Sequence, residues 1–365
     1  MQINRRNFIK TLGLVGGTLI IPRLTFANIV NGMSFPGGLQ SNVTVFDRYA
    51  SNPVIDAGSP GTWNAHSVRS SDVLYYNGLY YQYYYGHIDN PNSYPRRIGM
   101  STSSDGYNYT SYAGNPILDL GSEGEWDDCH VTFPTVLKKG STWYMYYGGD
   151  NEITNGSNGT GLATSTDGYT FTKISNGIEG TSKILQKGGD GTWDEAHAAP
   201  SSIIWRADQG ENGEFWLYYS GVDISRVYYK IGLAKSTDGI NFTKYNGNPI
   251  FSPSATWESS LIVCFGVFEY NSVYYAVYSA NTGANHKIGI AKSIDGITWT
   301  RTGMYFFTKG NSSAWDDYFV LAPRLIFPQN DINQRALMYY TAVEYATGKN
   351  RIGVAIQQHI GNFGI

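Results

Sequence analysis

The sequence predicts an all-β protein, a five-bladed β-propeller with four antiparallel strands per blade, and internal repetition is the main reason. Five tryptophans recur about every 60 residues, a repeat length typical of propeller blades. Each is followed by a short apolar run, a turn and a tyrosine-rich run. The five are Trp63, Trp126, Trp193, Trp257 and Trp315.

The second half of the repeat supplies the third and fourth strands of each predicted blade. An Asp-Gly pair between two alternating runs is a strong signal for a tight β-hairpin turn. We therefore expect the aspartates of these pairs to be turn residues without a catalytic role. There are four of them, namely Asp105, Asp167, Asp238 and Asp295.

The fifth repeat is incomplete at its C-terminal end. Its third strand is expected at 351–356, but no Asp-Gly pair follows. Residues 46–55, FDRYASNPVI, are similar to the fourth strands expected at 109–118 and 242–251. We expect this N-terminal segment to complete the last blade, so that the ring is closed by the N-terminal strand and an exposed sheet edge is removed.

Residues 1–27 have the pattern of a twin-arginine signal peptide. Arg5 and Arg6 precede an apolar, glycine-containing run at 11–21, and Ala27 ends a small-residue cleavage site. We expect residues 28–365 to form a single propeller domain, located in the periplasm or secreted. An uncleaved N-terminal anchor is the alternative.

The composition favours a neutral, hydroxylated ligand. Charged residues make up 15% of the chain, and the net charge is −3. Without a run of Lys or Arg, nucleic acid and membrane are not expected partners. The chain contains 30 tyrosines, and aromatic rings stack on the C–H faces of sugars while their hydroxyls form hydrogen bonds. We therefore expect a carbohydrate partner; the oligomeric state stays open.

Polar residues that follow the repeat tryptophans are the candidates for chemistry. The innermost strand of each blade lines the channel and begins after the tryptophan, so these side chains are expected to converge on one mouth. Crowded carboxylates can hold one acid protonated beside an ionised one, as glycoside hydrolysis requires. The predicted catalytic residues are Asp128, Glu195 and Asp317, and the predicted substrate-binding residues are His66, Arg69, His130, Asp194, His197, Tyr318 and Arg324.

Structural roles are the alternative for several of these residues. The first acid after each of four tryptophans could equally tether the blades; these acids are Asp127, Asp194, Glu258 and Asp316. The histidines could bind sugar hydroxyls, tune a carboxylate or hold an axial ion such as Ca²⁺. Their spacing is not a local metal motif, so neither a metal site nor a cofactor is predicted. Two cysteines, Cys129 and Cys264, are expected to be small buried residues without a disulfide.

The repeat motifs resemble those of the five-bladed β-propeller glycosidases. The Trp-acid units, the NPIL and NPIF exits and the IG-x-A-x-S-x-DG strands are similar to that superfamily, from about Val43 to the C-terminus. It includes arabinanases, β-xylosidases (glycoside hydrolase family 43), invertases and levansucrases, with the family 130 mannoside phosphorylases alongside. The resemblance implies carboxylates on the inner strands of the first three blades, acting as base or nucleophile, modulator and acid.

The sequence departs from the family 43 pattern and indicates a divergent member. The first blade has no carboxylate before Asp72, and Glu195 lies five residues ahead of Pro200, whereas the family pattern has two. The predicted function is an exported glycoside hydrolase acting on a poly- or oligosaccharide, with Glu195 as acid and Asp128 as base. A non-catalytic carbohydrate-binding propeller is one alternative. A glycoside phosphorylase is another, for which Arg69 and Arg324 are the cationic groups near the channel. The glycan, the anomer, endo or exo action and the stereochemical course stay open.

Overall fold

The computed structural model describes residues 46–88, 95–151, 159–259, 261–282, 285–327 and 335–357. All of them belong to the compact unit that spans Asn42–Ile365. The predicted signal peptide, residues 1–27, lies outside the described residues. In the described part of the chain, no helix has the length and apolar character needed to cross a membrane.

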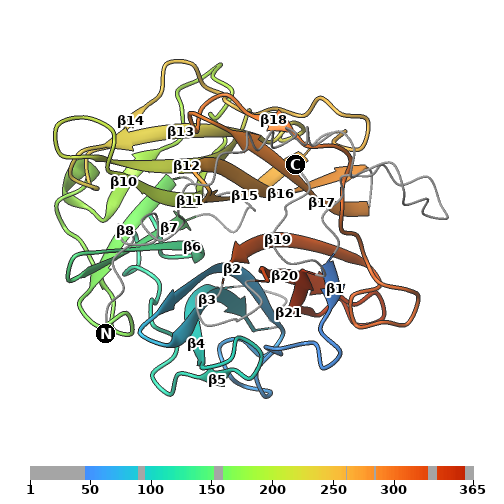
Figure 1. Ribbon diagram of the computed structural model, residues 1–365. Coiled ribbons are helices and arrows are strands. Elements are labelled where there is room, and N and C mark those ends of the chain that lie inside the picture. Colours follow the sequence, from blue (N-terminus) through green and yellow to red (C-terminus); the bar gives the residue numbers. More distant parts are fainter. Residues whose placement is uncertain are drawn as a thin grey trace, which may run out of the picture. The chain divides into compact units, whose positions relative to one another are not determined.

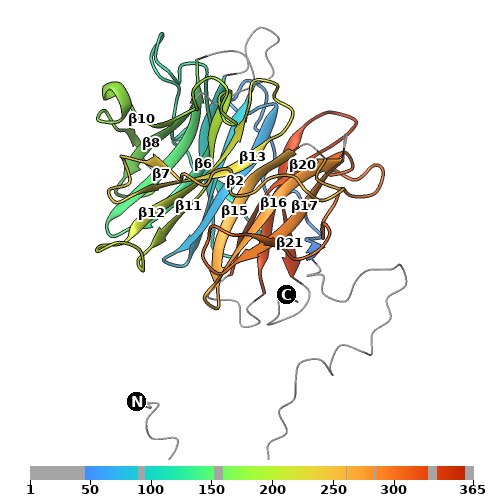
Figure 2. The same ribbon diagram turned by 90° about the horizontal axis from the view of Figure 1, so that it is seen from above.

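The described strands form five antiparallel, four-stranded blades. In four of them the strands pair in sequence order from the inside outwards, and in the fifth the N-terminal strand is outermost. Figure 1 shows the first strand of every blade nearest the middle, and Figure 2 shows these inner strands running beside one another. The predicted fold class is confirmed.

The strands of blades 1 to 3 are β2 (Ser67–Tyr76), β3 (Leu79–His87), β4 (Arg96–Ser103) and β5 (Thr110–Ser111); β6 (His130–Lys139), β7 (Thr142–Asp150), β8 (Gly159–Ser165) and β9 (Thr172–Lys173), with β10 (Lys183–Gln186) also on β8; and β11 (His197–Arg206), β12 (Glu214–Val222), β13 (Lys230–Ser236) and β14 (Thr243–Lys244). Blade 4 consists of β15 (Leu261–Tyr270), β16 (Val273–Thr282), β17 (Asn285–Ser293) and β18 (Thr300–Arg301), and blade 5 of β19 (Phe319–Ile326), β20 (Leu337–Val343), β21 (Asn350–Gln357) and β1 (Phe46–Arg48).

The N-terminal strand completes the last blade, as the sequence predicts. Strand β1 pairs antiparallel with β21, so that Phe46 lies opposite Gln357 and Arg48 opposite Ala355. Asn52 then binds the same strand through its side chain, which accepts from the amide of Val354 at 2.9 Å and donates to its carbonyl at 2.8 Å. The two ends of the described chain are therefore held together in one sheet.

Each repeat tryptophan packs on a glycine of the third strand. A Cβ atom added to any of these glycines would lie 2.5–2.8 Å from the indole ring, closer than real side-chain carbons approach. This close contact explains the Ile-Gly motif in the third strand of the repeat, because only glycine leaves room for the ring. The pairs are Gly99–Trp63, Gly161–Trp126, Gly232–Trp193, Gly289–Trp257 and Gly353–Trp315.

Neighbouring blades are linked by a tyrosine of the second strand. Its hydroxyl donates to the carbonyl of the Asp-Gly glycine in the next blade, at 2.8–2.9 Å. In blade 4 this position is Val277, and blade 5, which would come next, has no Asp-Gly hairpin. The tyrosine is therefore present in each blade whose next neighbour has an Asp-Gly glycine, and absent in the blade whose next neighbour lacks one. The four contacts are Tyr83–Gly168, Tyr146–Gly239, Tyr218–Gly296 and Tyr339–Gly106.

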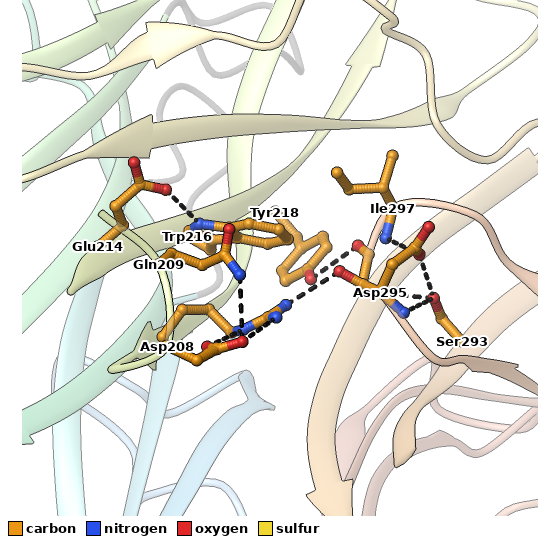
Figure 3. Close-up of polar contacts among 10 residues, drawn as sticks. Asp208, Gln209, Glu214, Trp216, Tyr218, Ser293, Asp295 and Ile297 are labelled. Atoms are coloured by element: carbon orange, nitrogen blue, oxygen red, sulfur yellow. Dashed lines mark hydrogen bonds and ion pairs between the residues drawn. The ribbon is translucent and has the colours of Figure 1, made fainter. Parts of the chain in front are cut away.

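An arginine strengthens the junction between blades 3 and 4 (Figure 3). The Arg206 guanidinium forms two hydrogen bonds of 2.8 Å with Asp208 and donates to the carbonyl of Asp295 at 2.9 Å. It lies 4.5 Å from the ring centres of both Trp216 and Tyr274. Charge pairing, cation–π contact and a hydrogen bond across the blades act together at this buried site.

Replacing Tyr218 by Phe is expected to lower the free energy of unfolding by about 0.5–1.5 kcal/mol, because the buried carbonyl of Gly296 keeps only the hydrogen bond from Trp299 Nε1 at 3.2 Å. Urea denaturation at pH 7 measures this loss. The half-buried Tyr144 on the preceding blade is the matched control, and Tyr144→Phe is expected to change stability by less than about 0.5 kcal/mol. Equal losses in the two variants would contradict the linking role of the hydroxyl.

Candidate functional site

A cavity of about 330 Å³ lies where the inner ends of the five blades meet. Every blade contributes to its lining, which places it on the axis of the ring. Its volume is within the range of small-molecule sites, about 300–1,000 Å³. The lining residues are Arg69, Tyr85, Arg96, Thr132, Phe133, Asp150, His197, Ala199, Pro200, Ser201, Ser220, Tyr229, Val263, Cys264 and Leu321.

Strained backbone shapes part of this cavity. The inner strands carry register shifts at matching positions, between Thr132 and Thr135 in β6 and between Val263 and Gly266 in β15. Within these bulges Phe133 has φ of 49° and Cys264 has φ of 56°. Non-glycine residues in this region cost of order 1–3 kcal/mol each, and such strain is concentrated at functional sites. Both residues line the cavity, which supports its assignment as the functional site.

One wall of the cavity is built by a row of polar residues across blades 1 and 2. By strand register His87 lies opposite Arg96, Arg96 beside His130, and His130 opposite Asp150. The Asp150 residue is 2% exposed. Burial lowers the pKa of Arg96, and the charge of Arg69 lowers it further, while Tyr85 and Asp150 oppose this effect. Arg96 therefore lies within electrostatic reach of both Arg69 and Asp150.

A second arginine reaches the same wall from the inner strand of blade 1. Arg69 lies opposite Tyr85 in the β2–β3 pair, and its Nη1 atom is 3.5 Å from the Tyr85 hydroxyl oxygen. Both residues line the cavity together with Arg96. Two guanidinium groups and one carboxylate, Asp150, are the charged groups among the described lining residues.

The histidines around the cavity are neutral at pH 7. Burial, together with the charges of nearby arginines, lowers the pKa values of His87, His130 and His286 to about 4. Burial and the charge of Arg226 lower that of His197 to about 4 as well. Neutral imidazoles can both donate and accept hydrogen bonds, which suits them to bind sugar hydroxyl groups.

Deeper in the channel, an ion pair connects several blades. Asp72 accepts hydrogen bonds from the amide of Val136 at 2.7 Å and the hydroxyl of Thr135 at 3.0 Å. Its Oδ1 lies 3.4 Å from Nε of Arg324, which also donates to the carbonyl of Ser201. Burial raises the pKa of Asp72, against the opposing charge of Arg324. Arg324, which the sequence suggests as a substrate-binding residue, is thus engaged in a structural contact next to the cavity.

The first acid after each tryptophan of blades 2 to 5 is a structural residue. Three of these carboxylates accept a hydrogen bond of 2.7–3.0 Å from a second-strand tyrosine, and all four pair at 2.6–2.8 Å with a cation on the fourth strand. We call each set a tether. The contacts of each tether lie within one blade, so they do not link neighbouring blades as the structural alternative supposes. They give Asp194 a structural role, and its part in substrate binding stays a prediction. The tethers are Asp127–Tyr147–Lys173, Asp194–Tyr219–Lys244, Glu258–Tyr278–Arg301 and Asp316–Arg48.

The three predicted catalytic acids also have structural positions, outside the cavity lining. Asp128 accepts from the backbone amide of Gly124 at 2.7 Å. Glu195 accepts from the amides of Gly191 at 2.5 Å and Ile224 at 2.9 Å. Asp317 accepts from the amides of Ser313 at 2.9 Å and Tyr345 at 2.8 Å. These carboxylates satisfy backbone N–H groups in turns and loops, and their catalytic roles stay predictions, whereas the carboxylate that lines the cavity is Asp150.

Known proteins share this architecture. Residues 213–341 match the family model described as beta-1,4-mannooligosaccharide phosphorylase. A solved structure named "Glycoside hydrolase" is similar with a TM-score of 0.67 and 17% identity, over 88% of this chain and 94% of the other. Another, named "The GH130 family of mannoside phosphorylases contains glycoside hydrolases that target beta-1,2 mannosidic linkages in Candida mannan", gives a TM-score of 0.65 and 16% identity, over 91% and 99%. These solved structures share the five-bladed propeller fold of this chain, and the family model matches about a third of it.

A relative of this propeller occurs in Mycobacterium tuberculosis (strain CDC 1551 / Oshkosh). It is an uncharacterised protein, MT1551, with 24% identity over 249 residues, which covers 67% of this chain and 77% of the relative. The resemblance to propeller glycosidases that the sequence predicts is confirmed at the level of the superfamily.

The remaining predicted site residues lie partly in the cavity lining and partly around it. Arg69 and His197 line the cavity. His130 belongs to the polar row, and the ring of His66 lies 5.1 Å from that of His87. Tyr318 packs against Phe319 and Tyr345 and does not line the cavity.

Sequence reasoning missed Arg96 and Asp150. Asp150 is the last residue of the second strand in its blade, three residues beyond the tether tyrosine Tyr147. At the same position, blade 3 has Val222 and blade 5 has Val343. A comparison of the repeats at this position would have shown that blade 2 carries a carboxylate where these two blades carry valine.

The two cysteines are partly exposed, so the expectation that both are buried residues is wrong. Cys129 and Cys264 are both free thiols, and burial raises the pKa of Cys264 to about 11. Across the described ranges, no three His, Cys, Asp or Glu side chains are grouped closely enough to hold a metal ion. The axial ion stays a prediction.

Replacing Glu195 by Gln is expected to leave kcat for glycoside cleavage within about threefold of the parent, because the carboxylate binds backbone amides and does not line the cavity. Thermal unfolding is expected to show a stability loss of about 1 kcal/mol from the weaker acceptor. Steady-state kinetics on the same substrate check the first point. A loss of activity by a factor of about a hundred or more, about 2.7 kcal/mol in the barrier, would restore Glu195 as the acid.

Proposed function

We propose that this protein cleaves a glycosidic bond by phosphorolysis in the central cavity, with Arg69 and Arg96 binding phosphate and Asp150 donating a proton. The observation that carries the proposal is the charge inventory of the described cavity lining: two guanidinium groups and one buried carboxylate. Arginine binds phosphate through paired N–H groups and stays charged at any physiological pH.

The single carboxylate favours phosphate over water as the acceptor. Hydrolysis by the usual route uses two carboxyl groups that flank the scissile bond, one as acid and one as base or nucleophile. In phosphorolysis a phosphate oxygen forms the bond to the anomeric carbon while the bond to the leaving sugar breaks. The Asp150 proton then goes to the leaving oxygen, and the products are a sugar phosphate and a shortened glycan. A second carboxylate is not needed.

Similarity to known proteins supports the same class of substrate. The family model matched by residues 213–341 is that of a mannooligosaccharide phosphorylase, so β-1,4-linked mannooligosaccharides are the first substrates to test. The neutral histidine His197 and Tyr229, which line the blade 3 side of the cavity, would bind the sugar hydroxyl groups.

Hydrolysis is the second candidate function. One similar structure is named for a family of mannoside phosphorylases that contains glycoside hydrolases for β-1,2 mannosidic linkages. The twin-arginine pattern of residues 1–27 also leads us to propose export, and water is then the abundant acceptor. In this case the two arginines would bind the substrate itself.

Turnover with and without phosphate distinguishes the two reactions. Protein lacking residues 1–27 is incubated with β-1,4-mannooligosaccharides, and sugar phosphate and free sugar are quantified separately. Phosphorolysis requires sugar phosphate to appear only when phosphate is added. Equal release of free sugar without phosphate would replace it by hydrolysis, and binding without turnover of any glycan would favour the carbohydrate-binding alternative.

A pair of adjacent arginines provides a matched test of the phosphate site. Arg96→Gln is expected to raise KM for phosphate at least about tenfold, the loss of one charge-assisted contact. Arg97→Gln is the control, because Arg97 pairs with the exposed Asp119 at 2.7 Å and does not line the cavity. Identical phosphate dependence in both variants would remove Arg96 from the site.

A further inference from the structure

The tether is missing from one blade, and both of its charged ends are replaced there. Blades 2 to 5 carry an acid after the tryptophan and a Lys or Arg at the end of the short outer strand. In blade 1 these two positions are Asn64 and Ser111. The tether tyrosine, Tyr84, is retained and fully buried. The change therefore affects the charged pair alone and leaves the aromatic framework in place.

A cavity of about 420 Å³ is present at this position in blade 1. Its lining includes Ser111 of the short outer strand β5, whereas the lining of the central cavity includes residues of all five inner strands. Its walls are mostly aromatic rings and uncharged polar groups. The lining residues are Val54, Ile55, Asp56, Gly58, Thr62, Trp63, Asn64, Tyr84, Ser101, Tyr109, Ser111, Tyr112 and Asn115.

Without a lysine at this position, three rings of the blade 1 cavity lining are partly exposed, namely those of Trp63, Tyr109 and Tyr112, while Tyr84 lies buried behind them. In blade 2 the Lys173 ammonium lies 5.7 Å from the ring centre of the tether tyrosine. The equivalent residue in blade 1 is the short, exposed Ser111, which cannot cover a ring. Trp63 stacks on Tyr84 with ring centres 6.0 Å apart and planes 13° from parallel. An apolar, flat ligand surface would take the place of the lysine side chain.

Hydrogen-bonding groups surround the same space. The Asn115 amide nitrogen lies 3.1 Å from the Ser111 hydroxyl oxygen and 3.5 Å from that of Tyr84. The Thr62 hydroxyl donates to the Asn64 side-chain carbonyl at 3.1 Å. These amides and hydroxyls can exchange such contacts for those of a ligand that has several hydroxyl groups of its own.

Lining chemistry, and not size, sets the blade 1 cavity apart. The equivalent cavity of blade 2 has a similar volume of about 440 Å³. Its lining, however, includes four charged residues, Glu125, Asp127, Lys173 and Glu179, whereas the blade 1 lining has one, Asp56, which pairs with Arg351 at 3.0 Å. Charged side chains keep their hydration and their own partners there, which disfavours a neutral ligand.

We propose that the blade 1 cavity is a binding site for a neutral sugar unit of a glycan chain, separate from the central cavity. Aromatic faces that stack on C–H surfaces, combined with amide and hydroxyl groups around them, are the chemistry that recognises uncharged saccharides. The proposal goes beyond the cleavage reaction, since a site on the outer part of a blade binds a glycan without cutting it.

Restoring the tether provides a direct test. The experiment uses the Asp150→Asn protein, in which turnover is suppressed. Titration calorimetry is carried out with β-1,4-mannohexaose, xylohexaose and arabinohexaose, and one of these saccharides is expected to show two binding events. The double variant Asn64→Asp/Ser111→Lys rebuilds the acid–tyrosine–cation set of the other blades, and its lysine fills the blade 1 cavity. The binding event that belongs to this cavity is therefore expected to disappear. Thr110→Lys places the same charge on the neighbouring exposed residue and is the control, expected to keep both events.

A second variant tests the same site without introducing charged side chains. Tyr112→Ala removes one aromatic wall without adding charge and is expected to weaken the same event at least about tenfold. Cleavage of a disaccharide by the Asn64→Asp/Ser111→Lys protein with Asp150 intact is expected to be unchanged. If no saccharide shows an event that both variants remove, the proposal is overturned. This outcome is independent of the phosphate test, because binding is measured without turnover.

Discussion

Asp150→Asn is expected to lower kcat for glycoside cleavage by about 10²–10⁴-fold, the contribution of a positioned general acid. The substitution keeps the shape of the side chain but removes its ability to give up a proton to the leaving oxygen. The residue is 2% exposed and lines the central cavity beside Arg96 and Thr132. Steady-state kinetics with a saturating glycan measure the change, and titration with an inactive substrate analogue is expected to show that binding persists.

Asp128→Asn is the matched control for this prediction. It makes the same chemical change on the same blade, but Asp128 accepts from the amide of Gly124 and lies outside the cavity lining. Its kcat is expected to stay within about threefold of the parent. A leaving group of low pKa, such as dinitrophenol, needs little protonation and is expected to restore much of the activity of Asp150→Asn. Lack of any such rescue, or an effect of Asp128→Asn as large, would contradict the assignment.

Asp72→Ala is expected to lower the free energy of unfolding by about 3–5 kcal/mol, because removing one partner of a buried ion pair leaves the other without compensation. Arg324 is 9% exposed in its side chain, and the amide of Val136 and the hydroxyl of Thr135 would also lose their acceptor. Urea denaturation monitored by tryptophan fluorescence gives the change directly.

A double-mutant cycle separates the ion pair from simple loss of packing. Asp72→Ala/Arg324→Met removes both charges, and its loss of stability is expected to be smaller than that of Asp72→Ala alone. Asp72→Asn keeps an acceptor for Val136 and is expected to fall between the parent and Asp72→Ala. A loss of less than about 1 kcal/mol for Asp72→Ala would show that the pair does not hold the blades together.

The fold could be predicted because each blade repeats the same local rules. An Asp-Gly turn, a tryptophan that needs a glycine opposite it, and a tyrosine-rich second strand are all short-range features visible in the repeat. The closing strand could be found for the same reason, since residues 46–55 carry the Asn-Pro exit seen in two complete blades.

The same repetition directed the sequence-based prediction of catalytic groups to acids that have structural contacts. Acids that follow the tryptophans recur because tethers and turn caps recur, as Asp127 and Glu195 show. Catalysis, by contrast, needs an asymmetric arrangement at one point of the ring. Asp150 and Arg96 lie on different strands and meet through the contact between β4 and β6, which only the folded chain reveals. Positions that differ between repeats carry this information better than positions that agree.

The tyrosine link occurs at four of the five borders between the described blades. In four blades a tyrosine hydroxyl donates to a glycine carbonyl of the next blade. Blade 4 has Val277 at the position of the tyrosine, and blade 5 has no Asp-Gly glycine as acceptor. This hydrogen bond is therefore missing at one border of the described ring, between blade 4 and the blade that the N-terminal strand completes. Blades 4 and 5 are joined by a different hydrogen bond, from the amide of Ala322 to the Ser279 hydroxyl at 2.9 Å. We expect amide hydrogens at this border to exchange with solvent earlier than those at the borders that have the tyrosine link.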